Sequence, residues 1–167
     1  MPDNNSDARR KLWDLVAGIQ IGMLTTRDND VLRSRPMAAL LDREQEVLWF
    51  FTSAKQHSAA EVAAQPDVNI SFVDPGRGVY VSLSGTAELV DDRQKANELW
   101  TAEAVAWSPE NIDSSDLRLM RVSATQAEYW DRHSNAMSVV WHAARAALGD
   151  ETEPAEDHRK VNIAADD

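Results

Sequence analysis

The chain has 167 residues, none of them cysteine, and its formal net charge is -11, with 28 acidic and 17 basic residues. That charge repels phosphate backbones and anionic lipid headgroups, so we expect neither nucleic acid nor a membrane surface as a partner. The absence of cysteine excludes disulfides, thiolate catalysis and thiolate metal sites. With 43% apolar residues the length suits one core, which we expect in a single domain over residues 1–148.

The two ends of the chain are polar. Met1 to Asp7 contains no apolar signal segment, and no later stretch is long and apolar enough to span a bilayer. We therefore expect a soluble cytoplasmic protein. Residues 149–167 are mainly acidic and offer little to bury, so a disordered tail is expected there.

The first part of the chain predicts a helix and then a hairpin. Apolar residues from Leu12 to Ile19 recur at helical spacing, and Ser6 or Asp7 is placed to cap that helix. Strands are expected at 23–26 and 31–41, joined by a polar turn. Pro36 lies within the second strand and predicts a bulge or an interrupted ladder there.

The next strand has a different pattern. Val47 to Thr52 is an almost continuous apolar run, which is typical of a buried strand. The loop from Ser53 to Ser58 then opens a helix that ends before Pro66. Two more strands, at 68–73 and 79–90, follow after that helix.

A helix and one more strand complete the expected elements. Asp91 or Asp92 is placed to cap a helix with Ala96 on its buried face. We expect the acidic segment 107–116 to be a solvated loop and 117–125 to be the last strand. Strands linked by hairpins favour an antiparallel barrel, closed or partly closed, because such a sheet leaves few exposed edges.

Two segments carry the residues best suited to bind an anion. Arg33-Ser34-Arg35-Pro36-Met37 is an extended basic segment, and the loop after the apolar strand opens a helix. Cations and helix N–H groups together bind phosphate, so we expect a phosphate-bearing cofactor. Arg35 is the leading candidate, because a guanidinium can bind phosphate in bidentate fashion. The alternative for Arg35 is a solvated strand arginine.

The order of these segments resembles the split-barrel flavin-binding family that includes pyridoxamine 5'-phosphate oxidase, and especially its general stress protein branch. The resemblance spans roughly residues 10–131 and rests on Gly22-Met23-Leu24-Thr25-Thr26, Ser34-Arg35-Pro36-Met37, Leu48 to Thr52 with its loop, Val81-Ser82-Leu83-Ser84-Gly85-Thr86-Ala87, and Ala127-Glu128-Tyr129-Trp130-Asp131. It implies a mainly β (α+β) fold, a six-stranded antiparallel split β-barrel with flanking helices. It also implies a homodimer with FMN at the subunit interface.

The resemblance assigns cofactor contacts to two strands. It places the FMN phosphate on Arg35 and the flavin ring along the backbone that follows, at Pro36, Met37 and Ala38. It places further contacts at the end of the apolar strand, on Phe51, Thr52 and Ser53.

The loop after that strand departs from the family pattern. Relatives place Ser, then Arg or Pro, then Lys, where this chain has Gln56, His57 and Ser58, so the lysine is missing. Lys55, three residues before that position, and His57 are the candidates for the lost positive charge. A weaker set of cations implies lower FMN affinity, a different phosphorylated ligand or an empty site.

The expected function is FMN-dependent oxidoreductase chemistry with a small-molecule electron donor or acceptor, in which the cofactor carries the electrons. Trp107 and Trp130 are candidates to flank the flavin ring from the partner subunit, with simple interface packing as the alternative. No catalytic side chain is assigned, and the histidines have no metal-ligand spacing. The alternatives are a non-enzymatic flavin-binding or stress-response protein, or a split barrel that binds a deazaflavin or haem.

Overall fold

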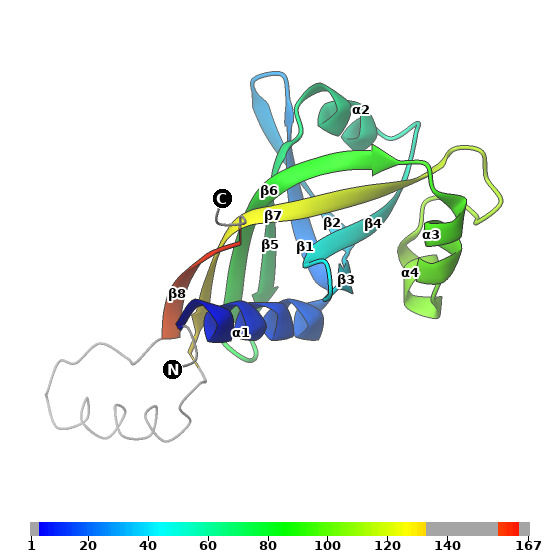
Figure 1. The fold of residues 1–167 in the computed structure, drawn as a ribbon. Helices are drawn as coiled ribbons and strands as arrows, with labels where there is room; N and C mark the ends of the chain where they lie inside the picture. The colour runs from blue at the N-terminus through cyan, green and yellow to red at the C-terminus, as the bar shows by residue number, and fades with distance from the viewer. Residues whose placement is uncertain (1–3, 133–156, 164–167) are drawn as a thin grey trace, which may run out of the picture.

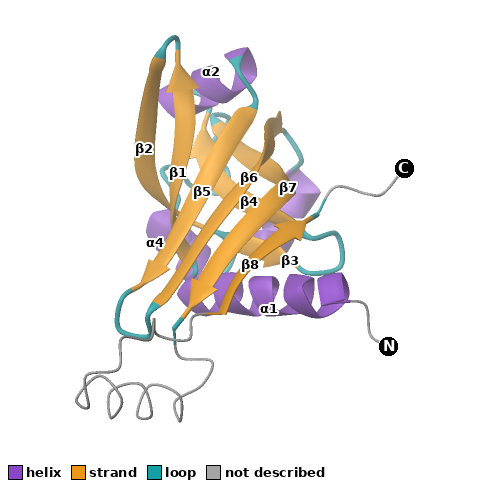
Figure 2. Ribbon diagram, turned by 90° about the vertical axis from the view of Figure 1, so that its left-hand side faces the viewer, coloured by secondary structure: helices purple, strands orange, loops and turns teal. Residues whose placement is uncertain are grey.

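The computed structural model describes residues 4–132 and 157–163, and its framework is one antiparallel sheet (Figures 1 and 2). The strands of the described chain are β1 (Ile21–Asp28), β2 (Val31–Ala38), β3 (Leu40–Asp42), β4 (Val47–Ser53), β5 (Asp67–Asp74), β6 (Val79–Val90), β7 (Leu117–Asp131) and β8 (Asp157–Asn162). The helices are α1 (Asn4–Ile19), α2 (His57–Ala64), α3 (Arg93–Leu99) and α4 (Ala102–Trp107).

The sheet curves around its core without closing. The strands pair in the order β2-β1-β5-β6-β7-β4-β3, with β8 added to β7, so β2 and β3 stand at opposite ends of that order. This arrangement confirms the predicted split barrel with flanking helices. The structure differs in strand number, because the single strand predicted at 31–41 is divided at Ala39 into β2 and β3, and because β8 is an additional strand.

β8 contradicts the predicted disordered tail. It forms an antiparallel ladder with residues 126–131 of β7, a stretch beyond the part of β7 that pairs with β4. Val161 is fully buried and Ile163 is 7% exposed, and both belong to the main core. Two apolar side chains on one face are enough to hold this segment against the sheet, because the free edge of β7 supplies the backbone hydrogen bonds. The prediction is therefore wrong for residues 157–163, and the rest of the predicted tail lies outside the described residues.

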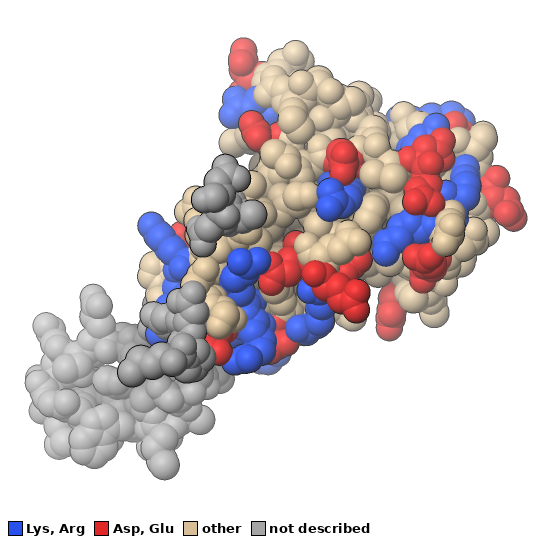
Figure 3. All heavy atoms as spheres, in the orientation of Figure 1, with Lys and Arg blue, Asp and Glu red and all other residues tan. Residues whose placement is uncertain are grey.

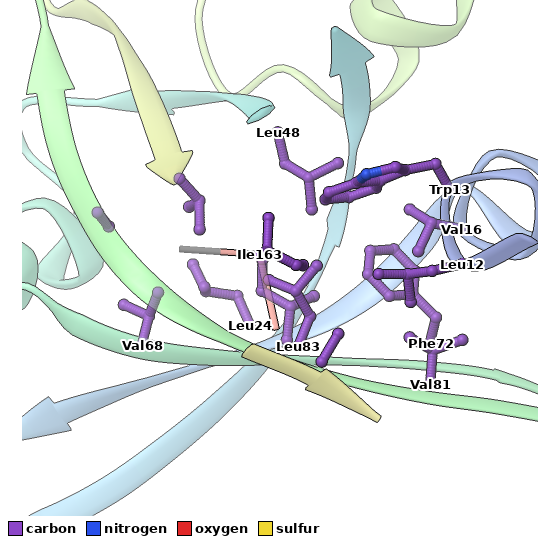
Figure 4. Packing of buried hydrophobic residues seen from close by; sticks show 14 of the residues in the cluster. Leu12, Trp13, Val16, Leu24, Leu48, Val68, Phe72, Val81, Leu83 and Ile163 are labelled. Carbon is purple, nitrogen blue, oxygen red and sulfur yellow. The ribbon is translucent and has the colours of Figure 1, made fainter. Parts of the chain in front are cut away.

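α1 covers the main core at one end of the sheet (Figure 1). Leu12, Trp13 and Val16 are buried, and Figure 4 shows these side chains pointing from the helix toward Leu48 and Phe72. Their spacing of one, three and four residues places them on one helical face, as the apolar pattern predicts.

The predicted helix caps have different outcomes. α1 includes Asn4, so Ser6 and Asp7 lie inside its first turn and the predicted cap at either residue is wrong. Asp7 instead forms an ion pair with Arg10, one turn further on. At α3 the prediction is confirmed, because the Asp92 carboxylate accepts a hydrogen bond from the Lys95 backbone N–H at 2.9 Å.

β4 is buried on both faces, which explains its continuous apolar run. All of its residues are buried. Leu48 and Phe50 pack in the main core, whereas Trp49 and Phe51 pack in a second cluster with residues of α3 and α4. In that cluster the rings of Phe51 and Trp100 meet edge to face, with centroids 5.0 Å apart.

Gly85 marks an irregularity in the longest ladder of the described sheet, between β6 and β7. The register shifts between Ser84 and Gly85. A Cβ atom at Gly85 would lie 2.2 Å from the backbone oxygen of Ser123, so no other residue fits without moving the backbone.

Charged side chains are unevenly distributed over the surface. Figure 3 shows them gathered near α1 and near α3 and α4, while the middle of that face is mostly uncharged. None of the helices in the described ranges is long and apolar enough to cross a membrane.

Candidate functional site

A cavity of about 180 Å³ lies where β2 and β3 meet the end of β4 and α4; we call it the β2–α4 pocket. Its wall combines a strand segment, an apolar strand end and a short helix. The lining residues are Arg35, Pro36, Met37, Ala38, Leu40, Phe51, Gln56, Ala104, Trp107 and Pro109. The structure therefore brings together the basic strand segment, Phe51, Gln56 and Trp107, all of which were candidates from the sequence. Trp107 was expected to come from the partner subunit, whereas here it lines the pocket of its own chain.

β2 can line a pocket because it is the end strand of the sheet order. It pairs with β1 from Val31 to Ala38, and Pro36 lies opposite Met23 with no register shift, so the predicted bulge at Pro36 is wrong. A proline at an end strand removes no ladder hydrogen bond when its missing N–H faces away from the neighbour. The interruption comes at Ala39, whose N–H donates to the backbone oxygen of Gln20 at 2.8 Å.

Arg35 forms a partly buried hydrogen-bonded group with residues of β1 and α2. Its Nη1 donates to Thr26 Oγ1 at 2.7 Å and its Nη2 donates to Glu61 Oε2 at 2.8 Å. The Thr26 hydroxyl also donates to Glu61 Oε2. The Arg35 side chain is 26% exposed and that of Glu61 only 5%. The positive charge of Arg35, the residue predicted to bind phosphate, is thus balanced by a carboxylate of the same chain.

Glu61 is held in its charged form by its neighbours. Burial acts to raise the pKa of Glu61, but the hydrogen bonds from Thr26 and Arg35 and the charges of Arg35 and Arg33 outweigh it, so this pKa lies below its usual value. Its second oxygen, Oε1, is buried and has no hydrogen-bond partner in the described residues. A signal for this residue in the sequence is that Glu61 is the one acidic residue among the small and apolar residues from Ser58 to Ala64.

The start of α2 borders the β2–α4 pocket through Gln56. Gln56 is the N-cap residue of α2 and has an extended backbone, and no side chain caps the helix. Its side-chain Oε1 accepts a hydrogen bond from the buried Thr52 hydroxyl at 2.9 Å. A helix start without a side-chain cap leaves backbone N–H groups available to an anion.

Thr52, Ser53 and Lys55 do not line the pocket. Ser53 donates to Glu110 Oε1 at 2.7 Å, and Lys55 Nζ lies 2.5 Å from Asp116 Oδ2. The hydrogen bond to Asp116 comes first among the causes that raise the pKa of Lys55. Thr52, Ser53 and Lys55 are therefore each bonded to a side chain of the protein itself.

The acidic loop thus has a structural role that its sequence did not indicate. Glu110 accepts hydrogen bonds from Ser53 and, at 2.9 Å, from Ser114. These two bonds, that from Ser53 first, lower the pKa of Glu110. The expectation of a purely solvated loop is wrong for Glu110 and Asp116, because the Ser53 hydroxyl at the end of β4 bonds to Glu110 and the Lys55 amine just after β4 pairs with Asp116.

The remaining candidates lie elsewhere. Ser58 is buried inside α2, and His57 faces a second hollow next to α2. Trp130 on β7 stacks in parallel on His158 of β8, with ring centroids 4.9 Å apart. The single chain therefore leaves Trp130 outside the β2–α4 pocket, and its predicted approach from a partner subunit stays a prediction.

The pocket fits part of a flavin. Met37, Leu40, Phe51 and Trp107 provide apolar surface for a planar ring, and Arg35 and Gln56 lie at its polar side. Its volume of about 180 Å³ is below the range of roughly 300–1,000 Å³ typical of small-molecule sites. The pocket of one chain therefore encloses only a portion of a flavin.

Comparisons with known proteins agree with this architecture. The structure superposes with a TM-score of 0.76 on a protein of Jannaschia sp. CCS1 described as a general stress protein 26, at 27% identity over 94% of this chain and 99% of the other. A general stress FMN/FAD binding protein of Xanthomonas citri has the same fold, with a TM-score of 0.66 and 24% identity over 75% of this chain and 89% of the other.

One curated relative and one family model add sequence evidence. Protein bli-3 of Neurospora crassa is 31% identical over 91 residues, which are 53% of this chain and 44% of the relative, so the match spans less than half of that protein. The model of the family described as pyridoxamine 5'-phosphate oxidase like matches residues 7–154, which is most of the chain. The chain therefore belongs to the pyridoxamine 5'-phosphate oxidase-like family.

Proposed function

We propose that the protein binds FMN with the flavin ring in the β2–α4 pocket and uses it as an oxidoreductase with a small-molecule electron donor or acceptor. The observation that carries this proposal is the pocket itself, in which the basic segment of β2 meets Phe51, Gln56 and Trp107. The FMN/FAD binding protein of Xanthomonas citri, which has the same fold, supports the class of cofactor.

The chain's own residues would hold and shield the cofactor. Phe51 and Trp107 offer aromatic surface to the ring, and the backbone of Pro36 to Ala38 runs along the pocket wall. Arg35 and the uncapped start of α2 lie on the polar side, where a charged group of the ligand would face them. A bound flavin supplies the electron-transfer chemistry itself.

A homodimer would complete the site. The pocket of one chain is small, and Trp107 at its wall is 50% exposed. Val31 and Leu32 at the start of β2 are also exposed, at 61% and 64%. Exposed apolar side chains at the wall of the incomplete pocket and at the other end of β2 favour a second copy of the chain as the cover, with Trp130 of that copy as a candidate contact. We also propose that the protein is cytoplasmic.

A flavin-binding protein without enzymatic activity is the second candidate, and one observation favours it. Among the described lining residues of the β2–α4 pocket there is no Asp, Glu, His, Lys or Tyr, so no side chain there is suited to move a proton near neutral pH. Hydride exchange through the flavin alone does not require a proton-transferring side chain. The pocket is therefore compatible with an oxidoreductase as well as with a non-enzymatic flavin-binding protein.

Two experiments test these roles in order. Titration of FMN with the purified protein should quench flavin fluorescence saturably, with one flavin per chain; the absence of saturable binding would refute the proposal. The loaded protein is then mixed with NADH or NADPH under anaerobic conditions. Bleaching of the flavin absorbance and its return with an added electron acceptor would support the oxidoreductase, whereas binding without reduction would support the second candidate.

A further inference from the structure

One wall of the β2–α4 pocket is formed by α4 and by the start of the segment that follows it, residues 108–116, which we call the strap. Trp107, the last residue of α4, and Pro109 in the strap both line the pocket. In Figure 1 α4 lies on the side of the molecule opposite β8, and the strap leads from it into β7. The position of this wall therefore depends on what holds α4 and the strap in place.

Apolar burial holds little of this wall. Ala104 is the one buried residue of α4, and Ile112 is the strap residue that packs against the second core cluster. Trp107 and Val105 are half-exposed. A helix of six residues with one buried side chain gains little stability from packing, so the hydrogen bonds of its neighbours decide where it lies.

Glu110 joins the strap to the end of β4. Its Oε1 accepts a hydrogen bond from the buried Ser53 hydroxyl at 2.7 Å, and its Oε2 accepts one from Ser114 at 2.9 Å. The Ser108 hydroxyl donates to the backbone oxygen of Glu110 at 2.8 Å, so the residues on either side of Pro109 are bonded to each other. Because Pro109 directly precedes Glu110, the carboxylate fixes the part of the strap that lines the pocket.

A separate set of bonds holds the far end of the strap. The Ala54 N–H donates to the backbone oxygen of Asp116 at 2.8 Å, and Lys55 Nζ pairs with the Asp116 carboxylate. Arg93 at the start of α3 donates to the backbone oxygen of Ile112 at 2.8 Å. These contacts anchor the second half of the strap, so α4 and the first half can move when the Glu110 bonds break while the second half stays attached.

Glu110 is charged at neutral pH. The hydrogen bond from Ser53, and after it that from Ser114, lowers the pKa of Glu110, and the charge of Lys55 adds to this effect; burial and the charge of Asp116 oppose it. Hydrogen bonds to a charged acceptor are stronger than those between neutral groups. The two bonds therefore weaken when Glu110 is protonated.

We propose that α4 and the first half of the strap form a lid over the β2–α4 pocket, and that Glu110 is the positioning residue that keeps this lid closed. The closed pocket, of about 180 Å³, is smaller than ligand sites usually are, and a ring that enters between Phe51 and Trp107 requires the wall to move. Breaking the Glu110 bonds opens the lid, and their return closes Trp107 over the ligand. Only the identity of the ligand as a flavin rests on the proposed function.

The first test needs no ligand. Protein labelled with fluorotryptophan gives a fluorine NMR resonance for each tryptophan, and that of Trp107 is identified by its loss in Trp107→Phe. The contribution of Glu110 is present above its unfolded pKa and is lost as the pH falls through its lowered folded pKa. The Trp107 resonance should therefore shift toward that of a solvent-exposed tryptophan over this range, while that of Trp13 in the main core stays in place. Circular dichroism checks that the fold is retained.

Three variants separate the bonds of Glu110 from a general effect of charge. In Glu110→Gln the Trp107 resonance should lie near its low-pH position already at pH 7 and no longer respond to pH. Ser53→Ala should shift it in the same direction, because the bond from β4 is lost. Asp113→Asn is the matched control, since it removes the same charge from an exposed strap side chain that forms no bond in the described chain. An unchanged Trp107 resonance in Glu110→Gln, or an equal shift in Asp113→Asn, would overturn the proposal.

The second test uses FMN and separates a lid from a fixed wall. Loss of one charge-assisted hydrogen bond in Glu110→Gln should raise the open fraction, and with it both the association and the dissociation rate constant, about tenfold. Stopped-flow flavin fluorescence should then show a dissociation constant that changes much less than either rate constant. Faster dissociation with an unchanged association rate constant would indicate a fixed wall and overturn the lid. Absence of FMN binding to the native protein would refute the proposed function alone, because the fluorine NMR test does not depend on it.

Discussion

The ion pair between Arg35 and Glu61 predicts a large and pH-dependent loss of stability in the variant Arg35→Leu. In that variant the Glu61 carboxylate, 5% exposed, keeps only its hydrogen bond from Thr26, and its Oε1 has no partner already. Removing one partner of a buried pair costs about 3–5 kcal/mol. Because water reaches the 26% exposed Arg35 side chain, we expect a smaller loss than for a fully buried pair, about 2–3 kcal/mol at pH 7.

The sign of the pH dependence follows from the pKa of Glu61. In the native protein this pKa is lowered, so the carboxylate contributes stability above its unfolded pKa, and that contribution is lost as the pH falls through the folded pKa. In Arg35→Leu the hydrogen bond and the charge of Arg35 no longer lower the pKa of Glu61, so this pKa is higher than in the native protein. The loss of stability is therefore full at pH 7 and disappears as the pH falls through the folded pKa of the native protein. The difference in free energy of unfolding between the two proteins should therefore shrink from pH 7 to pH 4.

Urea unfolding followed by tryptophan fluorescence measures this difference. The double variant Arg35→Leu/Glu61→Leu should recover most of the stability at pH 7, because an apolar pair can replace a buried ion pair with little loss. Arg43→Leu is the control, since its exposed pair with Asp14 should contribute about 0–1 kcal/mol and Arg43 is not among the groups that lower the pKa of Glu61. A loss below about 1 kcal/mol at pH 7 for Arg35→Leu, a loss independent of pH, or a double variant no more stable than the single one would refute the reasoning.

Two further predictions concern the sheet. Gly85→Ala should lower the free energy of unfolding by about 3 kcal/mol, because its Cβ would meet the Ser123 backbone oxygen; a melting temperature equal to that of the native protein would contradict the close approach. Val161→Ala should cost about 2 kcal/mol in chemical unfolding, because Val161 is fully buried in the core, while the exposed neighbour Lys160→Ala should cost almost nothing. Equal effects of these last two variants would mean that β8 does not pack as described.

The fold was predictable where it depends on local pattern. The continuous apolar run of β4 indicated a strand covered on both sides, and the structure shows one core on each face. The loop after it opens α2 close to the expected residue. β8 was missed because its two anchors, Val161 and Ile163, stand in a mainly acidic segment, and average composition hides so few apolar residues.

The candidate site was predictable in its backbone and less so in its charges. The segment from Arg35 to Ala38 and the residues Phe51, Gln56 and Trp107 do meet in one pocket. The pairing of Arg35 with Glu61 was not predictable, because these residues are 26 positions apart and come together only when α2 packs on the sheet. The same holds for Lys55, which the sequence offered as a replacement cation and which pairs with Asp116 in the acidic loop.

The most direct test of the central claim, that a flavin ring lies in the β2–α4 pocket, compares two alanine variants of α4. Trp107 lines the pocket and is 50% exposed, whereas Val105 on the same helix is 48% exposed and does not line it. Fluorescence titration with FMN should give a dissociation constant about tenfold higher for Trp107→Ala than for the native protein, since an aromatic contact and its buried area are lost. Val105→Ala should bind FMN like the native protein. Unchanged binding by Trp107→Ala, or an equal loss in both variants, would contradict the placement of the ring.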